Sequence, residues 1–321
     1  MKKPLVDEHG RVHDYLRVSI IEKCNLRCRY CMPEDPEWTP KEDLCTTDEL
    51  LELVDTFISL GVKKVRLTGG EPLVRHDVDI ILKTLAERGV ELAMTTNGIL
   101  VDQYIALFEK CGLNRINVSL DTLKPNRFEM MTRRTGFEKV RANINKLLER
   151  EFELKVNAVI MRGVNDDELT DFVEWTRDIP LTVRFIEFMP FDGNRWDDNS
   201  MVPMAEIKDK IADKFMILRG KDGPNDTTKH YRVPGYKGQF GIISSMSEHF
   251  CGSCNRIRLL ANGSMKNCLF SNDEVSLLQP LRQGEDLEPI IRDTILEKKP
   301  SHAGRFRIAE EKNRSMVTIG G

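Results

Sequence analysis

Short apolar runs alternate with longer amphipathic stretches from residue 16 to about residue 215. The runs are rich in apolar and β-branched residues, which is typical of parallel strands that are covered on both faces. The first amphipathic stretch begins with Thr46 and Glu49, which stand at the spacing of a helical capping box. The predicted strands are 16–22, 64–68, 92–96, 115–120, 154–161 and 181–189. The later predicted helices are 77–88, 101–111, 124–150 with a break, 166–177 and 203–214.

The order of these elements predicts an α/β fold. Each strand is followed by a helix, and no Gly-x-Gly-x-x-Gly segment follows the first strand. Such units favour an incomplete (β/α)6 TIM-like barrel over a dinucleotide-binding sheet, and the chemistry of such barrels occurs at the carboxyl ends of the strands. We expect a barrel domain over residues 1–218 and a C-terminal region over residues 219–321 that closes the barrel opening.

Local composition supports three further predictions. Residues 219–237 are rich in glycine, proline and polar residues, and they predict a connection between the two parts. The tail after Arg305 is polar and is expected to be mobile. Asp166 and Asp167 follow Asn165 in front of a predicted helix, and we expect them to cap it because acidic side chains favour a helix N-terminus.

The charge of the chain limits the class of partner. The formal net charge of the 321 residues is -3, which argues against broad nucleic-acid binding because such binding needs a basic face. An anionic small substrate remains compatible, since one pocket can concentrate a few Arg and Lys side chains. No apolar run of about 18 residues is present, and the N-terminus lacks the apolar stretch of a signal peptide. We therefore expect a cytoplasmic protein without membrane contact.

Six of the eight cysteines fall into two groups near opposite ends of the chain. Cys24, Cys28 and Cys31 form a C-x3-C-x2-C loop directly after the first predicted strand. Three thiolates on one loop can hold three irons of a [4Fe–4S] cluster and leave the fourth iron open to a small molecule. A structural zinc site is the weaker alternative, because it needs four ligands and the loop contains no fourth one.

The first cysteine group resembles the signature of the radical S-adenosylmethionine (SAM) superfamily. Tyr30 supplies the aromatic residue that the family places before the last cysteine, and Gly69-Gly70-Glu71-Pro72 at the end of the second strand resembles its SAM-contacting segment. Glycine there is expected to let the backbone approach the ligand closely. The resemblance implies reductive cleavage of SAM to methionine and a 5'-deoxyadenosyl radical, for which the protein binds, orients and excludes solvent.

The second cysteine group comprises Cys251, Cys254 and Cys268, in the pattern C-x2-C-x13-C. His249 adjoins Cys251 and is a possible fourth ligand of a zinc site of the Cys3His type. A second iron–sulfur cluster with an open iron is the other interpretation. Spacing alone leaves both open. Cys45 and Cys111 are expected to be small hydrophobic residues with no cluster role.

The two groups together resemble the GTP 3',8-cyclase family of molybdenum cofactor biosynthesis, over nearly the whole chain. The segment from Cys254 through Arg256 to Arg258 resembles the family's Cys-x-Arg-x-Arg motif, and Gly320-Gly321 resembles its double-glycine tail. The resemblance implies two [4Fe–4S] clusters, SAM as cofactor and GTP as substrate. It also implies that the open iron of the second cluster binds the guanine edge, so that both clusters face one cavity in the barrel.

Individual site residues follow from the same resemblance. Arg17, Arg66 and Lys155 are charged residues inside apolar runs, and without the resemblance they would be interpreted as solvated, outward-facing strand positions. The glycines Gly320 and Gly321 are expected to support catalysis. The residues implied to contact SAM are Tyr30, Gly70, Ser119 and Met189, and those implied to contact GTP are Arg17, Arg66, Thr95, Lys155, Arg256 and Arg258.

The predicted reaction is therefore radical cyclisation of GTP. The radical would remove the ribose 3' hydrogen, and attack on guanine C8 would give (8S)-3',8-cyclo-7,8-dihydroguanosine 5'-triphosphate. Expected partners are an electron donor such as flavodoxin or ferredoxin and the downstream cyclic pyranopterin synthase, and a homodimer is possible. Two alternatives stay open: a peptide-modifying radical SAM enzyme with an auxiliary cluster, and a non-catalytic zinc or redox-sensing protein.

Overall fold

One twelve-stranded sheet contains all the strands predicted from the apolar runs. The computed structural model describes residues 3–248, 250–302 and 313–320. Its six central strands are parallel neighbours in sequence order. They are β1 (Tyr15–Ser19), β2 (Lys64–Thr68), β3 (Glu91–Thr96), β4 (Arg115–Ser119), β5 (Glu153–Ile160) and β6 (Thr182–Glu187). The prediction for β1 ran three residues too far, because residues 20–23 bond instead to the turn after β2.

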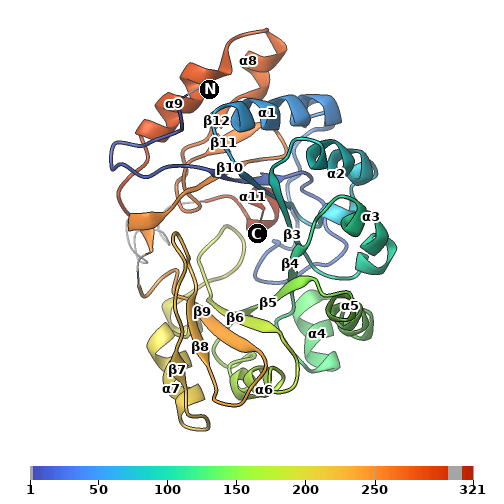
Figure 1. Cartoon of the computed structure of the whole chain (residues 1–321), viewed down its shortest axis with the longest axis vertical. Coiled ribbons are helices and arrows are strands. Elements are labelled where there is room, and N and C mark those ends of the chain that lie inside the picture. Colours follow the sequence, from blue (N-terminus) through green and yellow to red (C-terminus); the bar gives the residue numbers. More distant parts are fainter. Residues whose placement is uncertain (1–2, 249, 303–312, 321) are drawn as a thin grey trace.

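Helices cover the outer face of the curved sheet (Figure 1). The capping box of the first helix is confirmed, since the Thr46 side chain accepts from the Glu49 backbone and the Glu49 side chain accepts from the Thr46 backbone. The predicted break in 124–150 occurs at Arg133, whose φ is 55°, and Gly136, whose φ is 131°. The helices are α1 (Thr47–Ser59), α2 (Val78–Ala86), α3 (Ile105–Lys110), α4 (Pro125–Thr132), α5 (Phe137–Glu149), α6 (Leu169–Glu174) and α7 (Met204–Ala212).

The chain after residue 217 extends the sheet at both edges. Strand β9 (Gln239–Ile243) pairs parallel with β6, and β10 (Arg256–Leu259) pairs parallel with β1. The antiparallel strands beyond them are β8 (Lys229–Arg232), β7 (Leu218–Arg219), β11 (Ser264–Lys266) and β12 (Val275–Ser276). The segment 219–237 is thus more than the predicted connection, because it contributes the β7–β8 hairpin. The sheet is an open arc, as predicted for an incomplete barrel.

The end of the chain lies inside the arc. Helices α8 (Leu278–Arg282) and α9 (Leu287–Leu296) pack outside, while α11 (Met316–Ile319) is drawn at the centre of the barrel (Figure 1). Val317 and Ile319 are each 1% exposed. The prediction of a mobile tail is therefore wrong for residues 313–320, and its remaining residues lie outside the described parts. Single 3-10 turns occur at Lys41–Asp43, Pro72–Val74, Val101–Gln103, Asp198–Ser200 and Cys251–Ser253.

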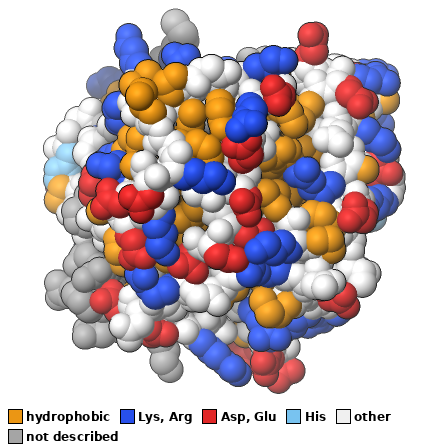
Figure 2. Space-filling model, turned by 90° about the horizontal axis from the view of Figure 1, so that it is seen from below, with side chains coloured by type: hydrophobic (Ala, Val, Ile, Leu, Met, Phe, Trp, Pro, Cys, Tyr) orange, Lys and Arg blue, Asp and Glu red, His pale blue; other side chains and the backbone are white. Residues whose placement is uncertain are grey.

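The main core lies between the sheet and its covering helices. It includes Phe57, Phe108, Phe172, Phe185 and Phe240, all fully buried. Cys45 and Cys111 also belong to this core, as predicted. No helix in the described part of the chain is long and apolar enough to cross a membrane. Figure 2 shows acidic and basic side chains intermixed over the face seen from below, without a field of one sign.

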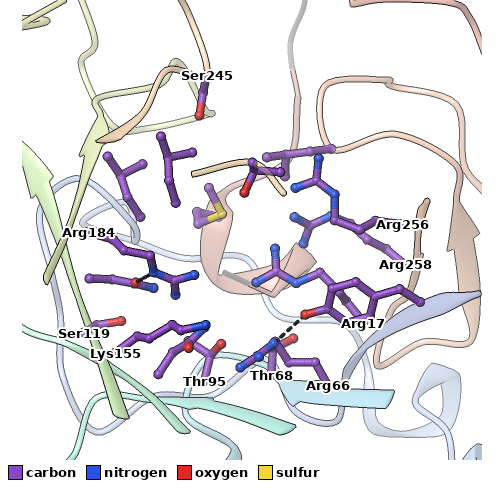
Figure 3. A pocket seen from close by; sticks show the side chains of 18 of the residues that line it. Arg17, Arg66, Thr68, Thr95, Ser119, Lys155, Arg184, Ser245, Arg256 and Arg258 are labelled. Carbon is purple, nitrogen blue, oxygen red and sulfur yellow. Dashed lines mark hydrogen bonds between the residues drawn. The ribbon is translucent and has the colours of Figure 1, made fainter. Parts of the chain in front are cut away.

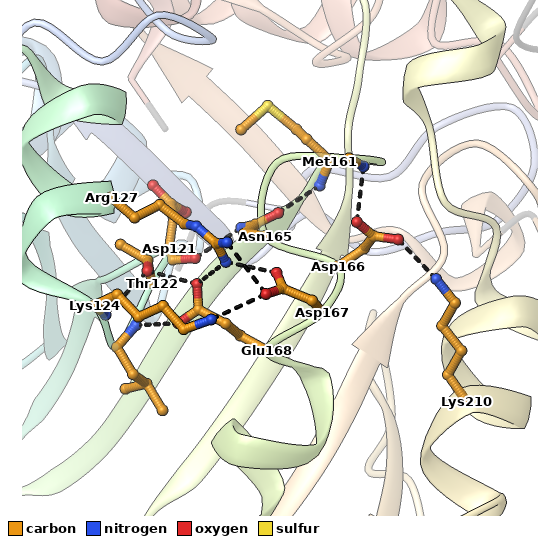
Figure 4. Close-up of polar contacts among 12 residues, drawn as sticks. Asp121, Thr122, Lys124, Arg127, Met161, Asn165, Asp166, Asp167, Glu168 and Lys210 are labelled. Carbon is orange, nitrogen blue, oxygen red and sulfur yellow. Dashed lines mark hydrogen bonds and ion pairs between the residues drawn. The ribbon is translucent and has the colours of Figure 1, made fainter.

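The acidic residues before α6 do not cap that helix. Asn165 donates from Nδ2 to the Asp121 and Val159 carbonyl oxygens, at 2.7 and 2.8 Å. Buried Glu168 accepts from the Thr122 hydroxyl at 2.6 Å. Asp166 pairs with Lys210, and Asp167 pairs with Lys124 and Arg127 (Figure 4). The cap prediction was wrong because Asp166 pairs with α7 and Asp167 pairs with the start of α4, while Asn165 and Glu168 bond to the segments at the carboxyl ends of β4 and β5.

Candidate active site

A cavity of about 680 Å³ fills the inside of the arc. Its lining includes the first cysteine group and eight lysines and arginines, among them Lys63 and Lys64. The other six converge in Figure 3: Arg17, Arg66, Lys155, Arg184, Arg256 and Arg258. From the strand pattern alone, these charged residues would be expected to point outward into solvent. In the structure they face the cavity instead.

Strand register explains why the cations converge. Arg17 on β1 lies opposite Arg66 on β2 and opposite Arg258 on β10. Side chains at paired positions of neighbouring strands point to the same face of a sheet, so these guanidinium groups share one level of the barrel. Lys155 on β5 and Arg184 on β6 stand across the cavity from them.

Burial and crowding of like charges make this level receptive to an anion. Burial, followed by neighbouring arginines, lowers the pKa of Arg17 to about 10 and that of Arg184 to about 9. Both remain charged at neutral pH. The Thr95 hydroxyl is buried beside them and has no hydrogen-bond partner among the described residues. The oxygen atoms of an anionic ligand would balance the arginine charges and would accept a hydrogen bond from the Thr95 hydroxyl.

Neutral groups hold these cations in place. Arg66 donates from Nε to the Tyr15 hydroxyl at 2.5 Å and from Nη1 to the Met94 carbonyl at 2.8 Å. Arg184 donates from Nε to Asn157 Oδ1 at 2.8 Å. The predicted residue set omitted Tyr15, Asn157 and Arg184. Arg184 carried the same signal as Arg17, a charge inside an apolar run, whereas the two neutral residues carried no signal.

The first cysteine group lies half-buried on the cavity wall. Burial, with a smaller effect of Glu71, raises the pKa of Cys24 to about 11. Cys24 Sγ accepts from the Leu26 amide at 3.4 Å and from Asn97 Nδ2 at 3.7 Å. Three thiols from one loop with N–H donors on a sulfur are a suitable donor set for a cluster with one open iron. The residues present therefore fit an iron–sulfur cluster.

The two glycines after β2 are required by the cysteine loop. A Cβ atom on Gly70 would lie 2.4 Å from the carbonyl oxygens of Glu22 and Lys23, and one on Gly69 would lie 2.4 Å from that of Ile21. The Gly70 amide donates to the Ile21 carbonyl at 2.7 Å. Both glycines also line the cavity. Close packing of two backbone segments thus already requires glycine, whereas the sequence suggested only the approach of a ligand.

The residues implied to contact SAM line the same cavity, although they come from four different segments. They are Tyr30, Gly70, Ser119 and Met189. Asp121, which the sequence interpretation did not include, is bonded to Tyr30 and accepts from the Val159 amide at 2.8 Å. Burial raises the pKa of Asp121 to about 6. Asp121 therefore fixes the aromatic residue of the cysteine loop against the ends of β4 and β5.

The second cysteine group lies just outside the cavity lining. Its neighbours Phe250, Asn255 and Leu269 line the cavity, but Cys251, Cys254 and Cys268 do not. His249, the alternative zinc ligand, lies outside the described residues. Among the side chains that the structure describes, no three imidazole, thiol or carboxylate groups are grouped so as to hold one metal ion.

Two cations contact one sulfur of this second group. Arg256 Nη2 lies 3.4 Å and Lys298 Nζ lies 3.5 Å from Cys254 Sγ. Burial opposes ionisation of this thiol, but Arg256 and Lys298 outweigh it and lower the pKa of Cys254 to about 6. A thiolate that is stabilised before metal arrives suits a metal ligand. The donor set therefore also fits a cluster.

The C-terminal segment joins the two sides of the cavity. Arg258 Nη1 donates to the Ile319 carbonyl at 3.2 Å and also to the Gly320 carbonyl. The Val317 amide donates to the Cys31 carbonyl at 3.3 Å. Gly320 has a φ of +76°, and a Cβ atom there would lie 2.4 Å from Thr68 Oγ1. Gly321 lies outside the described residues.

The chain matches two protein families in succession: the Radical SAM superfamily over residues 18–176 and Molybdenum Cofactor Synthesis C over residues 181–304. It is 50% identical to the mitochondrial GTP 3',8-cyclase of Arabidopsis thaliana, covering 99% of this chain and 83% of that protein. It is 41% identical to the GTP 3',8-cyclase of Syntrophomonas wolfei, covering 99% and 100%. It is 50% identical to the mouse molybdenum cofactor biosynthesis protein 1, but spans only 51% of that longer protein.

Solved structures support the fold. Streptococcus suis SuiB bound to S-adenosylmethionine has a TM-score of 0.61 at 14% identity, covering 90% of this chain and 68% of that one. The protein anSMEcpe with bound AdoMet has a TM-score of 0.54 at 12% identity, covering 88% and 82%. Identities this low inform only about the partial barrel. The full-length match to the cyclases is decisive, and the chain belongs to the GTP 3',8-cyclase family of radical SAM enzymes.

Proposed function

We propose that this protein is a radical SAM GTP 3',8-cyclase of molybdenum cofactor biosynthesis. The observation that carries the proposal is the single cavity that joins the first cysteine group to a ring of cations. When bound at Cys24, Cys28 and Cys31, a [4Fe–4S] cluster with SAM supplies the 5'-deoxyadenosyl radical that takes the ribose 3' hydrogen of GTP. Attack on guanine C8 then gives (8S)-3',8-cyclo-7,8-dihydroguanosine 5'-triphosphate.

The chain's own residues bind and orient the reactants. Tyr30, Gly70, Ser119 and Met189 are proposed to hold SAM against the first cysteine group, with the Asp121 bond to Tyr30 fixing the loop. The buried wall excludes water, which protects a reactive carbon radical from side reactions.

The cation ring is proposed to bind the triphosphate. Arg17, Arg66, Lys155, Arg256 and Arg258 supply positive charge, and Arg184 adds to it from β6. The Thr95 hydroxyl, which has no hydrogen-bond partner in the described part of the chain, adds a neutral donor. Bidentate guanidinium groups suit phosphate oxygens, and several such contacts fix the ribose in one orientation.

Cys251, Cys254 and Cys268 are proposed to hold a second [4Fe–4S] cluster whose open iron binds the guanine edge. Asn255 and Arg256 extend from this group into the cavity lining, which supports a common substrate site. Gly320 and Gly321 are proposed to complete the site from the tail.

The remaining expectations are also proposals. Residues 1–218 are proposed as the partial-barrel domain with the first cluster. Residues 219–321 are proposed as the C-terminal region with the second cluster and the double-glycine tail. The proposed partners are a flavodoxin or ferredoxin as electron donor and a downstream cyclic pyranopterin synthase, and the proposed assembly is a homodimer. The cytoplasmic location stays a prediction, and the name of the plant relative places that protein in mitochondria.

Anaerobic turnover tests the proposal. Reconstituted protein is incubated with SAM and a reductant, with GTP, ATP or no nucleotide, and 5'-deoxyadenosine and the cyclised nucleotide are quantified. We expect both products only with GTP. Equal 5'-deoxyadenosine release in all three incubations would contradict the cyclase and favour another substrate, including the peptides of the alternative. Zinc in place of iron after anaerobic purification would contradict the radical chemistry altogether.

A further inference from the structure

A buried lysine from outside both cysteine motifs lies against the second cysteine group. Lys298, just after α9, is only 4% exposed. Its Nζ atom lies 3.5 Å from Cys254 Sγ and donates to the Arg256 carbonyl at 2.8 Å. No carboxylate in residues 3–248, 250–302 or 313–320 pairs with this ammonium group. Burying an ammonium group without an anion is costly, so the thiolate of Cys254 is its natural counter-ion.

The position of Lys298 is built by the N-terminal segment. Arg11 donates from Nη2 to the carbonyl oxygens of Lys298 and Lys299, at 3.2 and 2.8 Å. The same side chain donates from Nη1 to the Cys251 carbonyl at 2.9 Å. Arg11 is itself fixed by buried Asp7, at 2.6 Å. One guanidinium group thus joins the Lys298 turn to the turn of the second cysteine group.

Packing alone therefore does not explain why a lysine occupies position 298. An alkyl side chain would fill the same buried space without needing a counter-ion. The ammonium group instead reaches the sulfur that Arg256 contacts from β10. Hydrogen bonds and positive charge at cysteine sulfurs stabilise the reduced, more negative state of an iron–sulfur cluster, and they strengthen retention of the metal.

We propose that Lys298 is a positioning residue for the second cluster: its N–H···S bond and charge hold that cluster and raise its reduction potential. This inference rests on the proposed function, in which Cys251, Cys254 and Cys268 bind a cluster. Lys298 touches a ligand sulfur and neither substrate nor reacting atoms, so its effect reaches GTP only through the cluster.

Two substitutions separate charge from hydrogen bonding. Lys298→Met removes both the charge and the donor, whereas Lys298→Gln removes the charge and keeps an N–H donor. Lys299→Met is the matched control, because Lys299 is the exposed neighbour on the same turn. Iron per chain and midpoint potentials are measured on the reconstituted full chain by redox titration followed by electron paramagnetic resonance. The first cluster's signal is identified by its change on adding SAM.

We expect the midpoint of the second signal to fall in both Lys298 variants, further in Met than in Gln, and not in Lys299→Met. The expected change in Lys298→Met is about tenfold in the reduced-to-oxidised ratio at fixed potential, or about 59 mV for a one-electron couple. Iron falling from about eight to about four per chain in both variants, with an unchanged unfolding temperature, would also support the holding role.

Two outcomes would overturn the inference, and they differ. Wild-type iron content together with a wild-type midpoint in both Lys298 variants would refute the role of Lys298 and leave the second cluster intact. About four irons in the wild-type chain, with a single signal that responds to SAM, would refute the second cluster itself.

Discussion

The charged side chains that shift the thiol pKa values of the first cysteine group are carboxylates, whereas those that shift the pKa of Cys254 in the second group are cations. Glu71 and Asp121 add to burial in raising the thiol pKa values of the first group. Arg256 and Lys298 act against burial and lower the pKa of Cys254 to about 6. Cys24 and Cys254 therefore occupy opposite electrostatic environments in one chain.

This difference matches the two roles in the proposed function. Negative neighbours destabilise the added electron of a reduced cluster, so they keep it a strong reductant, as reductive SAM cleavage requires. Positive neighbours stabilise the electron-rich state and lie beside the anion-binding cavity, as a substrate anchor requires. In the proposed function, one cluster would give an electron and the other would hold the substrate.

The largest expected effects come from removing one ligand on each side. Cys28→Ser should abolish 5'-deoxyadenosine formation, because the radical originates at the first cluster. Cys268→Ala should leave SAM cleavage detectable but abolish the cyclised nucleotide, because only the proposed substrate anchor is lost. Quantifying both products after anaerobic incubation distinguishes the two. Full product formation by Cys268→Ala would show that the second group is not a substrate anchor.

The glycine tail tests whether the two sides share one substrate. Gly320→Ala should reduce GTP turnover about 10- to 100-fold, because its Cβ atom meets Thr68 and displaces the segment that contacts Arg258. Gly284→Ala is the control, since Gly284 has a similar φ of +73° with open space around its Cβ position. Initial rates at saturating SAM measure the effect. Equal rates for the two variants would mean that the tail does not act at the site.

Removing the carboxylate of Glu71 tests whether negative charge beside the first cysteine group lowers the reduction potential of its cluster. In the fold, Glu71 is fully buried and accepts from the Thr96 hydroxyl and the Asn97 amide, at 2.8 and 2.6 Å. Burial raises the pKa of Glu71 to about 7. Above that pH, Glu71→Gln should raise the midpoint of the first cluster and slow SAM cleavage, at a cost of about 1–3 kcal/mol in unfolding free energy from the disturbed bonds. Glu52→Gln, on an exposed face of α1, serves as the control. An unchanged midpoint would show that the charge of Glu71 does not affect the reduction potential of the first cluster.

The smallest expected effect is on the pH dependence of the unfolding free energy. It arises from His13, in the N-terminal segment whose Arg11 bonds to Lys298. Burial, and then Lys298, lower the pKa of His13 to about 4 although its Nε2 bonds to Asp7. The unfolded chain then binds more protons than the fold between pH 6.5 and 4, so stability falls as pH falls through that window. His13→Gln should flatten the slope by up to about 1.4 kcal/mol per pH unit.

Urea unfolding of the wild-type protein and of His13→Gln between pH 5 and pH 7.5 measures this slope. The ordinary histidine pKa of about 6.5 lies within this pH range. His9→Gln is the control, because His9 is exposed. Parallel slopes for wild type and His13→Gln would show that His13 is not buried in its neutral form.

Features encoded locally could be predicted from the sequence. The six central strands follow from short apolar runs, and the capping box follows from the spacing of Thr46 and Glu49. The spacing of Cys24, Cys28 and Cys31 indicated a cluster loop because these three cysteines lie on one short segment. The spacing of the second group left a zinc site and a cluster both open. The inward-facing strand cations were interpreted correctly only with the help of the family resemblance.

Pairings between distant segments could not be predicted. Lys298 lies 44 residues from Cys254, and Arg11 lies 240 residues from Cys251, so no spacing connects them. The acidic residues before α6 looked like caps, but they bond to loops of other units. The polar tail looked mobile, yet residues 313–320 are held by the barrel interior.

The alternation of strands and helices, the spacing of the two cysteine groups and the resemblance to the family could all be recognised in the sequence. Packing in three dimensions places β9 and β10 at opposite edges of the sheet, brings cations of five strands to one cavity, and gives Cys24 and Cys254 opposite electrostatic surroundings. The physical reason is that periodicity and ligand spacing act within a segment, whereas register, burial and charge neighbours arise only when separate segments pack together.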